Sequence, residues 1–279
     1  LMSSLSPAIH HLSVTGDCLE LVQITDTHLC RTPGGTLLGM DTDHSLEAVI
    51  DLVRRERPAM DAVLGTGDLS DQGAAESYQR LRSYFDGLTA NHFWLPGNHD
   101  DLALMLRAGG SERLCPELRG GGWQIIMLDS QIPGEVGGEL GSEQLVLLEQ
   151  RLAAAMAENL HTLVCLHHQP VKIGCDWLDE QMVVDADAFF ELLDDSPSVR
   201  GVLWGHVHQE LERDRNGVLL MASPSSCVQF APGQTNFKLD DMAPGYRWLR
   251  LHPNGRIETA VSRVTGVKFS VDLDSGGYL

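Results

Sequence analysis

Side chains able to bind metal ions stand at the ends of five apolar segments of this chain. They are carboxylates, one amide and several imidazoles, and they occur as Asp26-Thr27-His28, Gly67-Asp68, Gly97-Asn98-His99-Asp100, His167 and Gly205-His206-Val207-His208. Such oxygen and nitrogen donors suit manganese, iron, zinc or cobalt. The set is too large for one tetrahedral site and sufficient for two metals sharing a carboxylate. Because paired metals hold the attacking and leaving oxygens of a phosphoryl transfer, the pattern predicts a two-metal hydrolase of phosphate esters.

The segments that carry these side chains alternate with amphipathic stretches. Short apolar runs predict buried strands at 19–25, 62–66, 93–95, 123–128, 162–166 and 199–204. Apolar residues at helical spacing predict helices over 44–57, 74–88, 142–156 (with Ser142 as N-cap) and 186–193. This order is typical of α/β layers, whose ligands bind at the carboxyl ends of the strands.

Beyond residue 209 the pattern changes to strands without helices between them. We expect strands at 218–222, 246–251 and 257–264, the last two joined by a hairpin at Asn254-Gly255. These strands suggest a second, mostly antiparallel sheet. Because no linker or repeat divides the chain, we predict one domain over residues 1–265 and an irregular C-terminal tail over 266–279.

The amino-acid composition limits the kinds of partner that the protein can bind and indicates its cellular compartment. The net charge of −19 comes without a basic stripe, which argues against long nucleic acids as partners. Apolar stretches stay well short of a membrane span, so no membrane partner is expected. The six cysteines are widely separated and form no CxxC motif, and the first residues lack the charged and apolar regions of a signal peptide. We therefore predict reduced cysteines and a cytoplasmic location.

The five motifs in this order resemble the calcineurin-like metallophosphoesterase superfamily, and they span residues 24–208. The resemblance implies an α/β fold, a four-layer αββα sandwich with a dinuclear metal site at the carboxyl edge of the strands. It further implies three ligands for each metal and one bridge: Asp26, His28 and His208 for the first metal, Asn98, His167 and His206 for the second, and Asp68 between them. Iron with manganese is implied, although the same ligands would accept zinc or cobalt.

Two further segments, 166–179 and 222–245, look like the bacterial class III 3′,5′-cyclic AMP phosphodiesterases, apart from Gln169, where a third histidine is common. The resemblance implies hydrolysis of cyclic AMP to 5′-AMP by a metal-bridging hydroxide, with His99 as the catalytic proton donor to the leaving oxygen. The predicted substrate contacts are His28, Asp68, Asn98, His99 and His208. The segments of Trp177 and Phe230 either wall an adenine pocket or pack in the core.

Alternatives remain at this stage. The metal motifs also fit a glycerophosphodiesterase or another hydrolase of small phosphodiesters, and a scaffold without catalysis is a remote third hypothesis. The chain is expected to be a monomer or a dimer. Among neighbouring residues, Asp71 fits a helix N-cap better than a contact to the site, Asp100 is a candidate for orienting His99 or a ligand histidine, and His168 is expected to pack beside the site.

Overall fold

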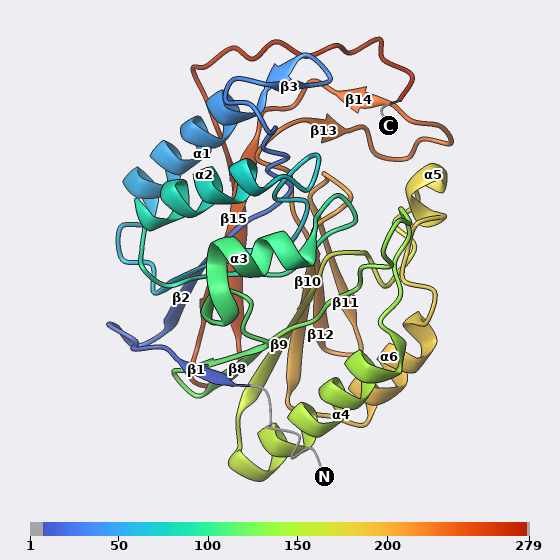
Figure 1. The fold of residues 1–279 in the computed structure, drawn as a ribbon. Coiled ribbons are helices and arrows are strands. Elements are labelled where there is room, and N and C mark those ends of the chain that lie inside the picture. Colours follow the sequence, from blue (N-terminus) through green and yellow to red (C-terminus); the bar gives the residue numbers. More distant parts are fainter. Residues whose placement is uncertain (1–7, 278–279) are drawn as a thin grey trace.

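The computed structural model describes residues 8–277, in which two β-sheets lie face to face between outer layers of helices (Figure 1). One sheet has the order β16-β15-β2-β5-β6 and the other the order β1-β7-β8-β9-β10-β12-β11. Helices α1, α2 and α3 cover the first sheet, and α4 and α6 cover the second. This arrangement confirms the predicted four-layer αββα sandwich.

The five-stranded sheet comprises β2 (Leu19–Ile24), β5 (Ala62–Gly65), β6 (His92–Trp94), β15 (Gly245–Leu251) and β16 (Ile257–Arg263). The seven-stranded sheet comprises β1 (Ile9–His11), β7 (Glu117–Gly120), β8 (Trp123–Met127), β9 (His161–Leu166), β10 (Val199–Trp204), β11 (Leu211–Arg215) and β12 (Val218–Ala222). The helices are α1 (Thr42–Glu56), α2 (Ala75–Asp86), α3 (Leu102–Arg113), α4 (Gly141–Glu158), α5 (Asp176–Asp179) and α6 (Ala186–Asp194). Two short hairpins are formed by β3 (Thr36–Leu37) with β4 (Met40–Asp41) and by β13 (Gln229–Phe230) with β14 (Leu239–Asp240).

The central strands are apolar on both faces because both faces are buried. In β2, Leu21 points into the core between the two sheets, whereas Val22 points into the core under α1 and α2. In β9, Leu163 likewise faces the other sheet and Val164 faces α4 and α6. Side chains alternate along a strand, so a continuous apolar run is what a doubly covered strand requires.

The late strands do not form the separate antiparallel sheet expected from the sequence. Instead β12 pairs in parallel with β10, and β15 pairs antiparallel with β2, so these strands complete the two sheets already present. The predicted hairpin between β15 and β16 is confirmed. The alternating pattern of these strands fixes which residues are buried and leaves the choice of neighbouring strand open.

The expected N-cap of α4 was also wrong. The helix begins at Gly141, and Ser142 lies inside it without capping. Asp185, which immediately precedes α6, accepts hydrogen bonds from the backbone nitrogens of Leu140 and Gly141 at 2.9 and 2.8 Å. A carboxylate from another segment thus satisfies the first donors of the helix.

Residues 266–277, the described part of the predicted tail, contain no helix or strand. They cross the edge of the molecule above β3, where Asp272 donates its backbone N–H to Leu38 O at 2.7 Å (Figure 1). Phe269 and Val271 pack against the apolar cores. Residues 278–279 lie outside the described residues, and the boundary at 265 stays a prediction. Among residues 8–277, no helix has the length and apolar character needed to cross a bilayer.

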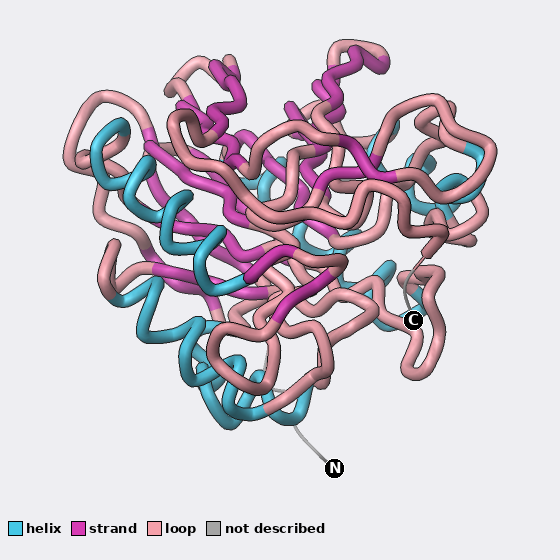
Figure 2. The backbone as a smooth tube through the Cα atoms, turned by 90° about the horizontal axis from the view of Figure 1, so that it is seen from above, coloured by secondary structure: helices cyan, strands magenta, loops and turns pink. Residues whose placement is uncertain are grey.

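The topology brings the carboxyl ends of five strands to one edge. Strands β2, β5 and β6 run parallel in one sheet, and β9 and β10 run parallel in the other. Figure 2, viewed from above, shows the loops that gather over this edge. The five predicted motifs lie in these loops.

Candidate dinuclear metal centre

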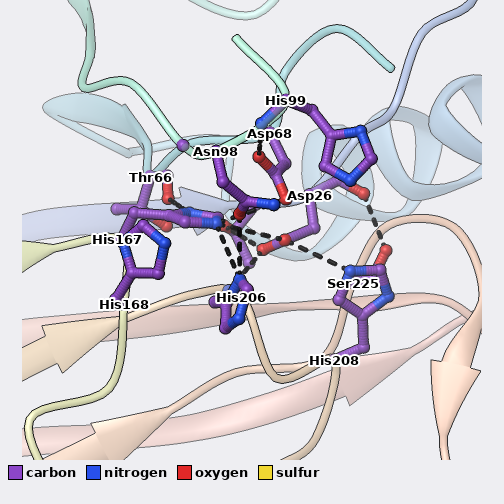
Figure 3. Close-up of polar contacts among 12 residues, drawn as sticks. Asp26, Thr66, Asp68, Asn98, His99, His167, His168, His206, His208 and Ser225 are labelled. Atoms are coloured by element: carbon purple, nitrogen blue, oxygen red, sulfur yellow. Dashed lines mark hydrogen bonds and ion pairs between the residues drawn. The ribbon is translucent and has the colours of Figure 1, made fainter. Parts of the chain in front are cut away.

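All seven predicted metal ligands converge at this edge, and Figure 3 labels six of them, all except His28. Each side chain lies within a few residues of a strand end: Asp26 and His28 after β2, Asp68 after β5, Asn98 after β6, His167 after β9, and His206 and His208 after β10. Apart from Asn98, which is half-buried, all of these residues are buried. Two sheets therefore supply one compact group of oxygen and nitrogen donors.

Asp26, His28 and His208 form the first cluster. Asp26 Oδ1 lies 3.2 Å from His208 Nε2 and 3.9 Å from His28 Nε2, and the two Nε2 atoms are 3.3 Å apart. The other carboxylate oxygen, Oδ2, accepts hydrogen bonds from Thr25 Oγ1 and His206 N, whereas Oδ1 is buried and accepts none. A buried carboxylate oxygen left unsatisfied among imidazole nitrogens fits a bound cation.

Asp68, His167 and His206 form the second cluster, and Asn98 adjoins it. His206 Nδ1 lies 3.1 Å from Asn98 Oδ1 and 3.3 Å from His167 Nε2. Asp68 Oδ2 lies 3.3 Å from His167 Nε2 and 3.7 Å from His28 Nε2 of the first cluster. The Asp68 carboxylate thus reaches both clusters, which is the position a bridging ligand needs. The ligand roles themselves stay predictions.

Each histidine of the two clusters has its second ring nitrogen bonded on the side away from the cluster. The partners are Asp71 Oδ1 for His28 (3.0 Å), Thr66 O for His167 (2.7 Å), Val228 O for His208 (2.8 Å) and Gln181 Oε1 for His206 (2.8 Å). Such acceptors fix the tautomer and the ring orientation of a metal ligand. The donors are therefore preorganised toward the two cluster centres.

The backbone of the site is held in an unusual conformation. Eight non-glycine residues among the described residues have positive φ, and five of them are site residues: Asp26 (55°), His28 (45°), Asp68 (49°), His206 (70°) and His208 (49°). This region is uncommon for L-residues and tends to mark functional sites. The left-handed turns aim side chains from the strand ends inward.

Two glycines of the motifs are required by close approach. A Cβ on Gly205 would lie 2.6 Å from Asp26 Oδ2, and one on Gly97 would lie 2.8 Å from His167 Cε1. Real side chains do not tolerate these distances, so the loops can approach the ligands only without a Cβ. The glycines explain why the motifs read Gly-Asn-His-Asp and Gly-His-x-His.

The site carries a strong negative potential. Burial alone would lower the pKa of His28, but its hydrogen bond to Asp71 and the charge of Asp68 raise the pKa to about 9. Burial is likewise outweighed at His167, whose pKa rises to about 10 mainly because of Asp68. Conversely, burial disfavours the Asp68 anion, yet His167 holds the pKa of Asp68 well below its usual value. A site that draws positive charge so strongly suits bound cations.

Two acidic residues near the ligands have other roles than expected. Asp71 caps no helix, because α2 begins at Ala75 after an N-cap residue without a side-chain bond; Asp71 instead contacts His28. Asp100 orients no histidine. Its carboxylate accepts hydrogen bonds from the backbone of Leu69, Ser70 and Gly97 and from Tyr78 Oη, which ties the Asp68 loop to the Asn98 loop.

His168 and Gln169 support segments around the site. His168 packs beside the site, as expected, with its ring nitrogens bonded to Ser130 Oγ and Val136 O, and burial lowers its pKa to about 3. Gln169 donates to Leu178 O at 2.6 Å and so holds the segment around α5.

Sequence reasoning missed Gln131 and Gln181. Gln131 donates to Gly97 O and Asp100 O at 2.8 and 2.5 Å, and Gln181 contacts His206. Neither residue belongs to a motif, and no local pattern marks it.

A pocket of about 470 Å³ opens beside the second cluster. Its polar end includes Asn98, His99 and His206, and its wall includes an aromatic group, Trp177, Phe230 and Phe237, together with Gly277 of the tail. Of the five predicted substrate contacts, Asn98 and His99 line this pocket. His28 and Asp68 are buried and do not line it, and His208 lines a smaller cavity that shares Phe230 with this pocket.

Close relatives match nearly the whole chain. The protein named 3′,5′-cyclic adenosine monophosphate phosphodiesterase CpdA from Pseudomonas aeruginosa is 49% identical over 259 residues, which cover 92% of this chain and 94% of that protein. The protein of the same name from Escherichia coli (strain K12) is 41% identical over 263 residues, which cover 93% of this chain and 95% of that protein.

Solved structures share the fold at low sequence identity. A dimetal phosphatase from Danio rerio has a TM-score of 0.62 at 15% identity and covers 88% of this chain and 99% of its own. Purple acid phosphatase PPD1 from yellow lupin seeds has a TM-score of 0.62 at 13% identity, and the match covers 91% of this chain and 53% of the phosphatase chain. The family model described as calcineurin-like phosphoesterase matches residues 19–210. With relatives of this identity over most of its length, the chain belongs to the calcineurin-like phosphoesterase family.

Proposed function

We propose that this protein is a metal-dependent phosphodiesterase that hydrolyses 3′,5′-cyclic AMP to 5′-AMP. The observation that carries the proposal is the aromatic-walled pocket that opens onto Asn98, His99 and His206 beside the two predicted metal positions. A cyclic nucleotide has one phosphodiester and one flat base, which match the polar end and the aromatic wall. The two bacterial relatives described above carry the name of this activity.

The buried donors fit a pair of metal ions. Asp26, His28 and His208 would hold one ion and Asn98, His167 and His206 the other, with Asp68 between them. When bound, such ions withdraw charge from the phosphodiester and make water nucleophilic near neutral pH. We propose iron with manganese, and the nitrogen and oxygen donors would also accept zinc or cobalt.

We propose that His99 gives a proton to the departing 3′ oxygen. Its backbone N–H donates to Asp68 Oδ1 at 2.8 Å, and its Nδ1 donates to Asp71 O at 2.9 Å. With Nδ1 engaged, Nε2 is the ring atom from which a proton can pass to the substrate. General acid catalysis of this kind contributes about 10²–10⁴-fold to the rate.

The aromatic wall offers a surface for adenine. The Trp177 ring packs edge-on against two phenylalanine rings. Its centroid lies 5.0 Å from the ring centroid of Phe230 and 5.1 Å from that of Phe237. Aromatic surface contributes apolar contact area and stacking, while the polar groups at the other end fix the orientation of the ligand. The net charge of −19 favours a small monoanion over a polyanionic nucleic-acid strand.

The test is a comparison of substrates with the metal-loaded protein. We expect cyclic AMP to be converted to 5′-AMP, with little release of 3′-AMP. Rapid cleavage of a chromogenic diester without cleavage of cyclic AMP would instead favour a glycerophosphodiesterase, and no cleavage of either would favour a scaffold. The cytoplasmic location and the monomeric or dimeric state stay predictions.

A further inference from the structure

Gln181 lies between α5 and α6, outside both sheets, yet it contacts a predicted metal ligand. Its Oε1 accepts a hydrogen bond from His206 Nε2 at 2.8 Å. We propose that Gln181 is a positioning residue that holds His206 in the tautomer and ring orientation in which Nδ1 faces the second metal position. The inference rests on the proposed metal-dependent activity and adds a residue to its site.

The two nitrogens of His206 have opposite tasks. Nδ1 lies 3.1 Å from Asn98 Oδ1 and 3.3 Å from His167 Nε2, so it is the atom directed at the second cluster. A neutral imidazole carries one proton, and a nitrogen that carries it has no lone pair for a metal. Because an amide oxygen only accepts hydrogen bonds, Gln181 Oε1 places the proton on Nε2 and leaves the Nδ1 lone pair available.

His206 differs from the other ligand histidines in how it is held. His167 and His208 donate to backbone carbonyls next to the sheets, and His28 donates to a carboxylate three residues after the Asp68 bridge. Among the four ligand histidines of the described chain, His206 is the one whose acceptor comes from the segment over residues 174–183. The geometry of this ligand therefore depends on a segment that lies beside the substrate pocket.

Independent contacts hold Gln181 in place. Gln169 donates its amide Nε2 to Leu178 O at 2.6 Å and accepts a bond at its backbone oxygen from Val183 N at 3.0 Å. The segment is thus anchored on both sides of Gln181 by a residue that follows the ligand His167 by two positions. Trp177, Leu178 and Gln181 of this segment all line the pocket, so Gln181 is a part of the pocket wall that contacts the metal ligand.

The test measures Mn²⁺ binding to the full chain by calorimetric titration, together with turnover. Gln181→Met keeps the length of the side chain and removes the acceptor. We expect one of two Mn²⁺ equivalents to bind about 10–100-fold more weakly, which is the usual effect of losing such a supporting contact. Gln181→Glu keeps an acceptor and should bind Mn²⁺ at least as tightly as the wild type. At limiting Mn²⁺ the Met variant should lose kcat, and excess Mn²⁺ should restore it with little change in KM.

Glu180→Ala provides a matched control, because Glu180 is the exposed neighbour of Gln181 on the same segment. It should bind both Mn²⁺ equivalents normally. If Gln181→Met does not fold, Gln181→Ala, which also removes the acceptor, takes its place. Normal Mn²⁺ binding by the variants without an acceptor, equal weakening in Gln181→Glu, or equal weakening in Glu180→Ala would overturn the inference.

The same titration separates this inference from the proposed function. A wild-type chain that binds two Mn²⁺ ions and leaves cyclic AMP intact would overturn the proposed function alone, because the role of Gln181 is tested by Mn²⁺ binding and does not require turnover. A wild-type chain that binds fewer than two Mn²⁺ ions would overturn the predicted dinuclear site and the role of Gln181 together.

Discussion

Asp100 joins the two loops that carry Asp68 and Asn98, and its removal should weaken the fold at the site. Oδ1 accepts hydrogen bonds from Ser70 N at 3.0 Å and Tyr78 Oη at 2.7 Å. Oδ2 accepts from Gly97 N at 2.8 Å and Leu69 N at 3.3 Å. The carboxylate is buried, so each of these donors depends on it.

Asp100→Asn preserves the shape of the side chain and replaces one acceptor by a donor. Whichever way the amide turns, its NH₂ group faces two buried donors, which then lose their partner. An unsatisfied buried group costs about 1–3 kcal/mol, so the expected loss in the free energy of unfolding is about 2–6 kcal/mol. Tyr78→Phe removes one side-chain donor to Asp100 and one acceptor for Asp101 N, and it should cost about 1–3 kcal/mol.

The assay is urea unfolding of metal-free protein followed by circular dichroism, since bound metal would add its own stabilisation. We expect the midpoint to fall in both variants, and further in Asp100→Asn than in Tyr78→Phe. A change smaller than about 0.5 kcal/mol in Asp100→Asn would contradict this role of Asp100, because a buried acceptor of four hydrogen bonds cannot be exchanged at no cost.

The remaining predictions concern the bridge, the proton donor and a histidine remote from the site. Asp68→Ala should lower bound Mn²⁺, measured by metal analysis, and abolish turnover; full metal content with normal turnover would exclude the bridging role. His99→Ala should keep its metal while kcat falls by about 10²–10⁴-fold for cyclic AMP, and by less for a diester with a good leaving group; an equal defect for both substrates would contradict proton donation. Burial lowers the pKa of His92 below its usual 6.5, so the unfolded chain binds more protons below that pH and stability should fall as pH drops through about 6.5. Between about pH 5 and 7, the free energy of unfolding measured with denaturant should depend less on pH in His92→Gln than in the wild type. An unchanged pH dependence would contradict the lowered pKa of His92.

The convergence of the candidate ligands could be predicted because each lies in a short motif shortly after a buried strand. Asp26, Asp68 and His167 follow largely apolar strands, and parallel strands bring such ends to one edge. Gly205 reinforced the pattern, since its missing Cβ allows close approach to Asp26. Type and spacing along the chain were therefore sufficient for the candidate ligand set.

The supporting residues could not be predicted because their contacts join distant segments. Asp71 reaches His28 across 43 positions, Gln131 reaches Gly97 across 34, and Gln181 reaches His206 across 25. No spacing along the chain distinguishes these residues from solvated polar side chains. The partners of β12 and β15 were missed for the same reason, because a strand pattern specifies a buried face and does not specify its neighbour.

The most direct test of a dinuclear metal centre that hydrolyses cyclic AMP is turnover as Mn²⁺ is added to metal-free protein, with the product separated by chromatography. A dinuclear cyclic AMP phosphodiesterase should show no turnover without metal, a rise that levels off at two Mn²⁺ equivalents per chain, and 5′-AMP as the product. Turnover in the presence of a chelator, a plateau at one equivalent, or no formation of 5′-AMP at any Mn²⁺ concentration would contradict a dinuclear cyclic AMP phosphodiesterase.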